Sequence, residues 1–307
     1  MVRGGTDGSS VEEFLTWLRV ERGRSANTIS SYRRDLSKAE EWLTSHGSGL
    51  EEAESEDLGR FVAHLQSSGE SAASTARRCA ALRMYFRHRV AEGARTSDPT
   101  VMLEGVRVAA GVPKPLSVDE MERVISSVPG DSPSDLRDLA LLEFMFATGA
   151  RVSEACGLDT GDIDRSSGVV RLFGKGSKER VVPIGDTALS AIDSYLNGGA
   201  RDILVGSGGR REDRQAVFLT NRGRRLNRQK AWEIVRTAGL RAGIERELSP
   251  HSLRHTCATL MLAGGADLRI VQEMLGHASI STTQVYTKVS QEQLLEVYRS
   301  SHPRAMT

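Results

Sequence analysis

Apolar side chains recur at helical spacing through the first hundred residues of the chain, in four stripes with a break after each. The stripes run through Val11–Leu18, Ile29–Leu43, Leu58–Leu65 and Cys79–Val90. Gly47 ends the second stripe, and Gly93 and Pro99 end the fourth. Four amphipathic helices of this length predict a small helical domain with a core of its own.

The pattern changes after residue 115, where helical stretches begin to alternate with short β segments. Ser117–Glu120 is a capping box that begins a helix, and Leu136–Phe146 is apolar on nearly all sides, as in a buried central helix. Val169–Phe173 and Arg180–Ile184 flank a glycine-containing turn and predict a β-hairpin. A weaker hairpin is predicted over residues 217–226.

These patterns predict a mainly α fold with a small antiparallel sheet, divided between two domains. Residues 99–115 contain Gly and Pro without a sustained period, which indicates a linker. The expected divisions are a disordered tail over 1–8, a helical domain over 9–98, the linker over 99–115, a second domain over 116–289, and a C-terminal helix and tail over 290–307.

Charge is strongly segregated along the 307 residues, although the net charge is only +1. Residues 41–57 hold six acids and no base, residues 71–110 hold seven Arg and three acids, and residues 201–260 hold twelve Arg, one Lys and six acids. Two basic regions, one in each domain, favour a clamp around a phosphate backbone over two solvated surfaces. The candidate DNA-binding residues are Arg77, Arg78, Arg83, Arg87, Arg89, Arg224, Arg225 and Arg228.

Other functional classes find no support in the sequence. No stretch approaches the roughly 18–20 apolar residues of a membrane span, and the polar start lacks a signal-type apolar run. The three Cys are widely separated, which indicates neither a disulfide framework nor a zinc site. We therefore expect a cytoplasmic protein with no membrane partner.

Candidate chemistry gathers in four motifs of the second domain. Arg151 follows a Thr-Gly break after the predicted buried helix, and Lys175 lies between two glycines in the hairpin turn. Ser249 and Pro250 begin a helix on which His251 and Arg254 share one face, beside a terminus that favours anions. Tyr286 follows the segment Leu275-Gly-His-Ala, which contains His277; taken alone, it would be a core tyrosine.

These residues are cations, hydrogen-bond donors and a phenol, without the clustered carboxylates that hard metal ions need. We expect neither a metal nor a cofactor. Fixed cations and donors can stabilise a pentavalent phosphoryl transition state, and a phenol can attack as a covalent nucleophile if a neighbour accepts its proton.

With these motifs the chain resembles the tyrosine recombinase, or phage-integrase-like, family. It resembles the Xer branch most, and the XerD type within it. The stretch FLTWLRVERGRSANTISSYRRDL is similar to the family's core-binding domain, and ATGARVSE, GKGSKERVVP, HSLRHTCATLML and LGHASISTTQVYT are similar to its catalytic signatures. The resemblance implies a C-shaped, two-domain DNA clamp, with a helical SAM-like domain and an α/β catalytic domain.

The resemblance also implies a role for each residue of the site. Arg151 and Arg254 would clamp the phosphate, Tyr286 would be the nucleophile, and His251 would exchange its proton. His277 would be a supporting donor, and Lys175 the acid that protonates the leaving 5′-oxygen, with Lys178 of the same hairpin as the alternative. Glu154 is expected to hold a catalytic Arg or His through a charge-assisted hydrogen bond.

The implied activity is site-specific recombination through a 3′-phosphotyrosyl intermediate, with resolution of chromosome dimers at a dif-like site during segregation and cell division. Implied partners are double-stranded DNA, a XerC-type recombinase, a tetrameric synaptic complex and an FtsK-like translocase. The C-terminal helix would dock onto a neighbouring protomer, or instead pack on its own domain. The alternatives are a mobile-element integrase, a type IB topoisomerase and a non-catalytic DNA-binding protein; the apparently complete catalytic set disfavours the last.

Overall fold

The computed structural model describes residues 7–103, 114–174, 179–276 and 288–305. The chain divides into two compact units, residues 1–112 and 113–307. Each unit has its own hydrophobic core: one lies within residues 14–103 and the other within residues 116–305.

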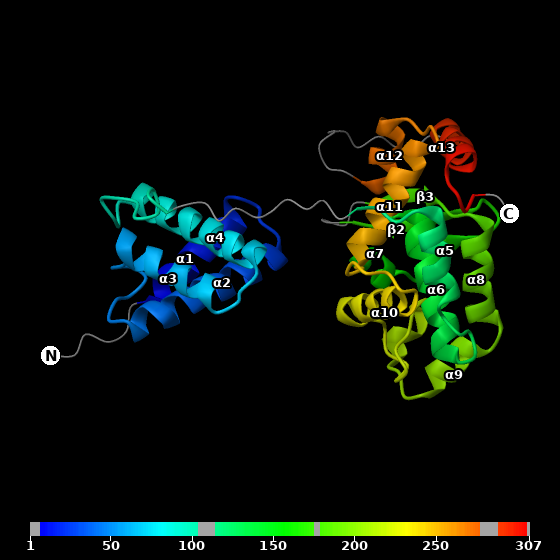
Figure 1. Cartoon of the computed structure of the whole chain (residues 1–307), viewed down its shortest axis with the longest axis horizontal. Helices are drawn as coiled ribbons and strands as arrows, with labels where there is room; N and C mark the ends of the chain where they lie inside the picture. Colours follow the sequence, from blue (N-terminus) through cyan, green and yellow to red (C-terminus); the bar gives the residue numbers. More distant parts are fainter. Residues whose placement is uncertain (1–6, 104–113, 175–178, 277–287, 306–307) are drawn as a thin grey trace. The chain divides into compact units, whose positions relative to one another are not determined.

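The first unit is a bundle of four helices (Figure 1). They are α1 (Asp7–Val20), α2 (Ala26–Ser45), α3 (Ser55–Ser67) and α4 (Ala72–Ala91). Each contains one of the four predicted apolar stripes. Ser25 and Ser71 begin α2 and α4 by accepting hydrogen bonds from backbone N–H groups of the first turn. Phe14, Leu36 and Phe86 are fully buried between the helices.

In the second unit, helices pack against a small antiparallel sheet. Its helices are α5 (Val118–Ser126), α6 (Pro133–Thr148), α7 (Val152–Gly157), α8 (Asp186–Asn197), α9 (Ala200–Gly206), α10 (Arg228–Arg241), α11 (Pro250–Ala263), α12 (Leu268–Leu275) and α13 (Lys288–Ser301). Two 3₁₀ turns, η1 (Thr160–Asp162) and η2 (Arg211–Gln215), complete the helical elements described. The predicted fold class, mainly α with a small antiparallel sheet, is confirmed.

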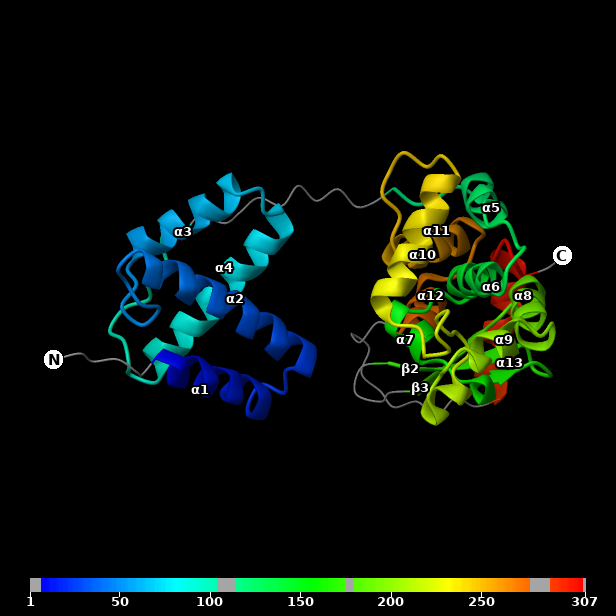
Figure 2. The ribbon, with the colours of Figure 1, turned by 90° about the horizontal axis from the view of Figure 1, so that it is seen from below.

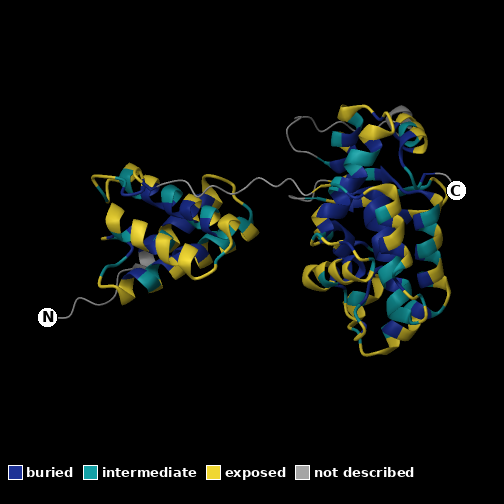
Figure 3. Cartoon of the chain, in the orientation of Figure 1, coloured by how far each residue is buried: buried dark blue, intermediate teal, exposed yellow. Residues whose placement is uncertain are grey.

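The helix predicted to be central is α6, which is buried along its C-terminal half (Figure 3). It packs between α8 and α11 (Figure 2). Ser132 begins it with a capping box, and Gly149 ends it at φ 58°. A side chain at Gly149 would be strained by this φ, and its Cβ would lie 2.6 Å from Leu275 Cδ2. The end of α6 therefore lies directly against the end of α12.

The sheet has the order β1 (Ile163–Asp164), β2 (Val169–Phe173), β3 (Glu179–Pro183), with β2 central. Val170 pairs with Val182, so the hairpin predicted here is confirmed. The two-residue strand β1 carries too short a pattern to be predicted. The weaker hairpin is confirmed in part: Leu219 and Arg225 form an antiparallel bridge, Leu226 N donates to Phe218 O and Thr220 N to Arg224 O, but the pairing is too short to give named strands.

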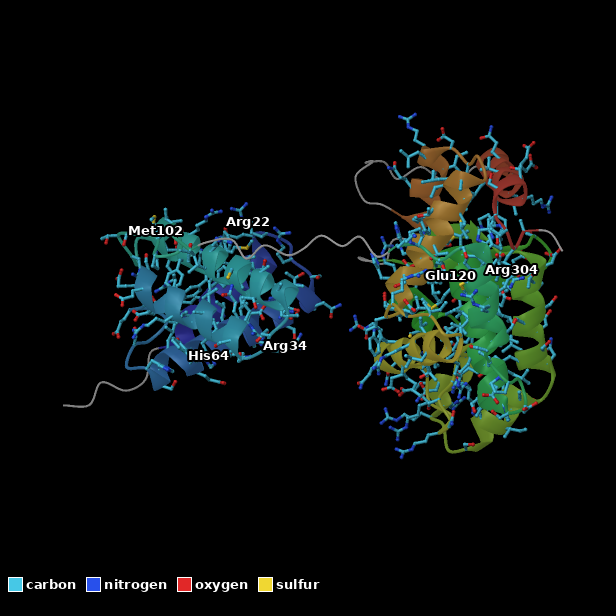
Figure 4. All side chains as sticks on the ribbon, in the orientation of Figure 1. Arg22, Arg34, His64, Met102, Glu120 and Arg304 are labelled. Carbon is cyan, nitrogen blue, oxygen red and sulfur yellow. The ribbon has the colours of Figure 1, made fainter. Side chains whose placement is uncertain are left out.

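The C-terminal helix α13 packs on its own unit, against α11, α12 and β3, and buries Leu294 and Tyr298. This is the arrangement left as an alternative to docking on a neighbour. The chain then continues along α6, where His302 Nε2 lies 3.2 Å from Phe146 O. Arg304, labelled in Figure 4, forms an ion pair with Glu143 of α6.

The longest described helices are α2 and α4, with 20 residues each. Both carry charged residues along their length. Nowhere in the described ranges is there a helix that combines the length and the apolar character needed to cross a membrane.

Candidate active site

Arg151 begins the short helix α7 and is held there by Glu154. The backbone N–H of Arg151 donates to Glu154 Oε2 at 2.7 Å, and its Nη1 donates to Glu154 Oε1 at 3.0 Å. The Glu154 side chain is 1% exposed, whereas that of Arg151 is 39% exposed. Arg151 is therefore fixed from behind by a buried carboxylate and remains accessible to a ligand.

Arg254 lies one turn into α11, which begins as expected with Ser249 as the cap and Pro250 in the first turn. It is only 8% exposed. Its Nη1 donates to Gly149 O at 2.7 Å, and its Nη2 donates to Leu275 O at 2.6 Å. His251, three residues earlier, is exposed on the same first turn.

Arg180 of β3 is a third arginine of this cluster, and sequence reasoning missed it. Its Nη1 and Nη2 donate to the two oxygens of Glu154 at 2.5 and 2.7 Å, and its Nε donates to Met274 O at 2.9 Å. A signal existed in the strand alternation, because Arg180 is in phase with the inward-facing Val182. A buried arginine in a strand requires a buried partner.

The three arginines converge on the last turn of α12. Arg180 donates to the carbonyl of Met274, Arg254 to that of Leu275, and Arg151 to that of Gly276, the last through Nη2 at 2.8 Å. The final carbonyls of a helix lack intrahelical partners and carry its negative dipole end, so cations are favourable there. The direction in which the chain leaves α12 is thus fixed by residues of α7, β3 and α11.

Positive charge exceeds negative charge in this cluster. Burial, reinforced by Arg151 and Arg180, lowers the pKa of Arg254 to about 10, while Glu154 acts in the opposite direction. Burial alone would raise the pKa of Glu154, but hydrogen bonds and charge from Arg180, with the contacts to Arg151, lower it below its usual range. The guanidinium groups of Arg151 and Arg180 share the Glu154 carboxylate, Arg254 has only backbone carbonyls as partners, and an anion can neutralise the excess positive charge.

Several predicted site residues lie outside the described residues. These are Lys175, its alternative Lys178, His277 and Tyr286. Of their described neighbours in sequence, Gly276 precedes His277 and accepts from Arg151, and Glu179 follows the two lysines and precedes Arg180. Arg151, Glu154 and Arg254 are brought together, with His251 on the helix that carries Arg254.

The candidate DNA-binding arginines of α4 differ from the uniform basic face that the sequence indicates. Arg77 and Arg78 pair with Asp35 of α2, and Arg78 also with Glu70. Arg83 donates to Leu103 O at 2.8 Å, and Arg89 pairs with Glu51. Among the described residues, only Arg87 of these five is exposed without a side-chain partner. Acids distant in sequence neutralise most of this face.

The second candidate group lies around the start of α10. Arg224 and Arg228 are exposed, whereas Arg225 donates to Asp159 Oδ1 at 2.6 Å and to the carbonyl of Cys156 at 3.3 Å. An open hollow of about 410 Å³ lies here, lined by Thr220, Asn221, Arg222, Arg224, Arg225, Asn227 and Lys230. Its cationic lining suits a polyanion.

No cluster of three or more His, Cys, Asp or Glu side chains is placed to hold a metal ion in the parts of the chain that the structure describes. The cysteines described, Cys79, Cys156 and Cys257, are buried and free. Burial raises the pKa of the Cys156 thiol to about 11 and that of Cys257 to about 12, so neither is suited to nucleophilic attack.

Comparison with protein families gives two matches. Residues 114–293 match the phage integrase family, and residues 11–93 match the phage integrase N-terminal SAM-like domain. The chain is 45% identical to the tyrosine recombinase XerD of Bifidobacterium longum over 298 residues, which cover 96% of this chain and 97% of that protein. It is 41% identical to the XerD of Yersinia pestis over 300 residues, covering 97% and 99%.

Solved structures show the same fold. A lambda integrase tetramer bound to a Holliday junction matches with a TM-score of 0.68 and 19% identity, over 95% of this chain and 78% of that one. The XerH recombinase bound to a palindromic difH substrate matches with a TM-score of 0.66 and 24% identity, over 94% and 84%.

Proposed function

This chain belongs to the phage integrase family of tyrosine recombinases, and we propose that it carries out XerD-type recombination at the arginine cluster around the end of α12. The observation that carries the proposal is the excess of positive charge among the described residues at Arg151, Arg180 and Arg254: the first two bond to the Glu154 carboxylate, and Arg254 bonds only to backbone carbonyls. A DNA phosphodiester supplies the missing negative charge.

Arg151 and Arg254 hold the non-bridging oxygens of the scissile phosphate. Fixed guanidinium groups stabilise the charge that develops on these oxygens in the pentavalent transition state, and they need no reorganisation when it forms. Arg151 is half-buried and open on one side, and Arg254 is anchored by two backbone carbonyls. Both arrangements keep the guanidinium plane in place.

Tyr286 attacks the phosphorus in line with the departing 5′-oxygen. The new bond joins the phenol oxygen to phosphorus, and the bond to the 5′-oxygen breaks. His251 accepts the phenol proton, Lys175 donates a proton to the 5′-oxygen, and His277 donates a supporting hydrogen bond. The product is a 3′-phosphotyrosyl link with a free 5′-hydroxyl, and attack by a 5′-hydroxyl from a second duplex reverses the chemistry without ATP.

DNA binding and assembly follow from the same proposal. The relatives named XerD support a cellular role in resolving chromosome dimers at a dif-like site, with a XerC-type partner and an FtsK-like translocase as activator. The lambda integrase tetramer on a Holliday junction supports a tetrameric synaptic complex. These processes place the protein in the cytoplasm.

The two units have separate roles in the proposed function. We propose that the helical domain over 9–98 and the catalytic domain over 116–289, joined by the linker over 99–115, both bind DNA. The matches to the SAM-like domain and to the phage integrase family support this division. Exposed Arg87, Arg224 and Arg228 are the contacts to phosphate that best fit it.

A covalent-adduct assay tests the nucleophile. The protein is incubated with a nicked duplex that carries a dif-like site, and the products are separated on a denaturing gel. The wild-type protein and Tyr32→Phe, a control in the first unit, should form a protein–DNA adduct, whereas Tyr286→Phe should form none. An adduct that persists in Tyr286→Phe would contradict the assignment of Tyr286, and no adduct with wild type on any dif-like site would contradict recombinase activity.

A further inference from the structure

Arg180 is the most completely enclosed cation of the site. Its side chain is 7% exposed, and all three of its guanidinium nitrogens donate hydrogen bonds. Both oxygens of Glu154 are involved, which makes this a bidentate pair. The protein thus engages three of the five N–H groups of Arg180 and leaves only 7% of this side chain exposed, which distinguishes it from Arg151, whose side chain is 39% exposed.

The position of Arg180 connects the elements that carry the catalytic groups. Through Glu154 it orients Arg151 at the start of α7, since that carboxylate accepts from both arginines. Through the carbonyl of Met274 it holds the last turn of α12. Its own strand, β3, begins at Glu179, directly after the sequence segment 175–178 that contains Lys175.

The chain also packs tightly on Arg180 where it leaves α12. Gly276 has a φ of 67°, and a Cβ built there would lie 3.2 Å from Arg180 Cδ. A side chain at Gly276 would thus press on the Arg180 stem as well as strain the backbone. The residue immediately before the segment 277–286 rests on this arginine.

We propose that Arg180 is a positioning residue for strand cleavage. It holds Arg151 and the last turn of α12, from which the segment with Tyr286 continues, in a fixed position relative to each other. This inference rests on the proposed function. Displacement of a reacting group by about 1 Å costs on the order of 10²-fold in rate. Loss of the bidentate geometry should therefore slow cleavage much more than it weakens DNA binding.

The test compares Arg180→Lys with a matched control, Arg246→Lys. Arg246 pairs with Glu120 through two nitrogens, at 3.1 and 2.6 Å, outside the arginine cluster. Adduct formation on the nicked duplex should fall about 10²-fold in Arg180→Lys and less than 3-fold in the control. DNA affinity, measured by gel shift, should stay within about 3-fold for both. Equal cleavage rates for the two variants would overturn the proposal.

A double-mutant cycle separates positioning from general destabilisation. If Arg180 acts through Arg151, Arg180→Lys should slow cleavage much less in the Arg151→Lys background than in the wild type. In that background the positioned Arg151 guanidinium is already absent. Additive losses would overturn the proposal. All rates are taken at a temperature where circular dichroism shows each variant folded; if Arg180→Lys does not fold at any temperature, Arg180→Gln takes its place in both comparisons.

Failure of the inference and failure of the proposed function give different results. Without an adduct from wild-type protein, the proposed function fails. With a wild-type adduct, but with Arg180 variants that behave like Arg246→Lys, only the positioning role fails.

Discussion

Arg254 stabilises the fold through its contacts and, in the proposed function, also binds the reacting phosphate. It donates to two backbone carbonyls, Gly149 O and Leu275 O, from a position that is 8% exposed. A planar guanidinium can bridge two carbonyls and still direct N–H groups elsewhere, whereas the ammonium of a lysine is a compact point charge.

Arg254→Lys should therefore slow adduct formation by about 10²–10³-fold, the usual cost of losing a fixed donor to a transition-state oxygen. DNA affinity should change by less than about 3-fold, because a positive charge remains. Rates on the nicked duplex and gel shifts measure the two quantities. A cleavage rate within 3-fold of wild type would show that Arg254 does not contact the reacting phosphate.

The arginines of α4 provide a matched pair at the same scale. Arg87 is exposed and without a partner among the described side chains, whereas Arg83 donates to Leu103 O. If Arg87 contacts a phosphate, Arg87→Gln should reduce the slope of log affinity against log salt by about 0.9 and leave thermal stability unchanged. Arg83→Gln should leave the salt slope unchanged and lower the stability by about 1 kcal/mol. An unchanged slope in Arg87→Gln would remove it from the interface.

At the scale of elements, the sequence predicts helices and their starts well. The caps at Ser117, Ser249 and Gly276 are local, since each depends on residues within a few positions. The alternation in β2 and β3 likewise predicts the hairpin. These features need no knowledge of the tertiary structure.

Features that depend on distant partners could not be predicted. Arg77 and Asp35 are 42 residues apart, so the neutralised face of α4 is invisible in local charge counts. The strand alternation marks Arg180 as inward-facing, but its partners Glu154 and Met274 lie 26 and 94 residues away in sequence and could not be predicted. The hairpin over 217–226 is shorter than predicted for a related reason: Leu226 N donates to Phe218 O, but Val217 N donates to Leu158 O instead of continuing the pairing.

The turn after α13 predicts a pH dependence. His302 stacks on Tyr298 with ring centroids 4.8 Å apart, its Nδ1 accepts from Arg304 N, and burial lowers its pKa to about 4. Between pH 6.5 and 4, His302 is protonated in the unfolded chain but remains neutral in the folded protein. Stability is therefore full above pH 6.5 and falls with decreasing pH, by up to about 1.4 kcal/mol per unit.

Thermal unfolding followed from pH 7 to pH 4 measures this contribution. His302→Phe keeps an aromatic ring in place and should show a shallower loss of stability over that range, whereas His64→Phe, at an exposed position, should match the wild type. Identical pH profiles for His302→Phe and the wild type would contradict the assignment.

At the scale of the whole molecule, the two separate cores predict two folding units. One core lies within residues 14–103 and the other within residues 116–305. Fragments 7–103 and 114–307 should each show helical circular dichroism and a cooperative thermal transition. Leu82→Ala should lower only the first transition and Leu142→Ala only the second, by about 2–5 kcal/mol each. A fragment without a cooperative transition would show that its unit depends on the other.

The three arginines on the final carbonyls of α12 also have a thermodynamic consequence. Two of them, Arg151 and Arg254, are the groups assigned to the phosphate, so occupancy by DNA and the exit direction of the chain from α12 are linked equilibria. If a bound phosphate stabilises these contacts by a given free energy, the formed contacts strengthen phosphate binding by the same free energy. In the proposed function, binding of the DNA phosphate therefore favours the positioning of the segment that carries the nucleophile, and that positioning favours binding of the phosphate.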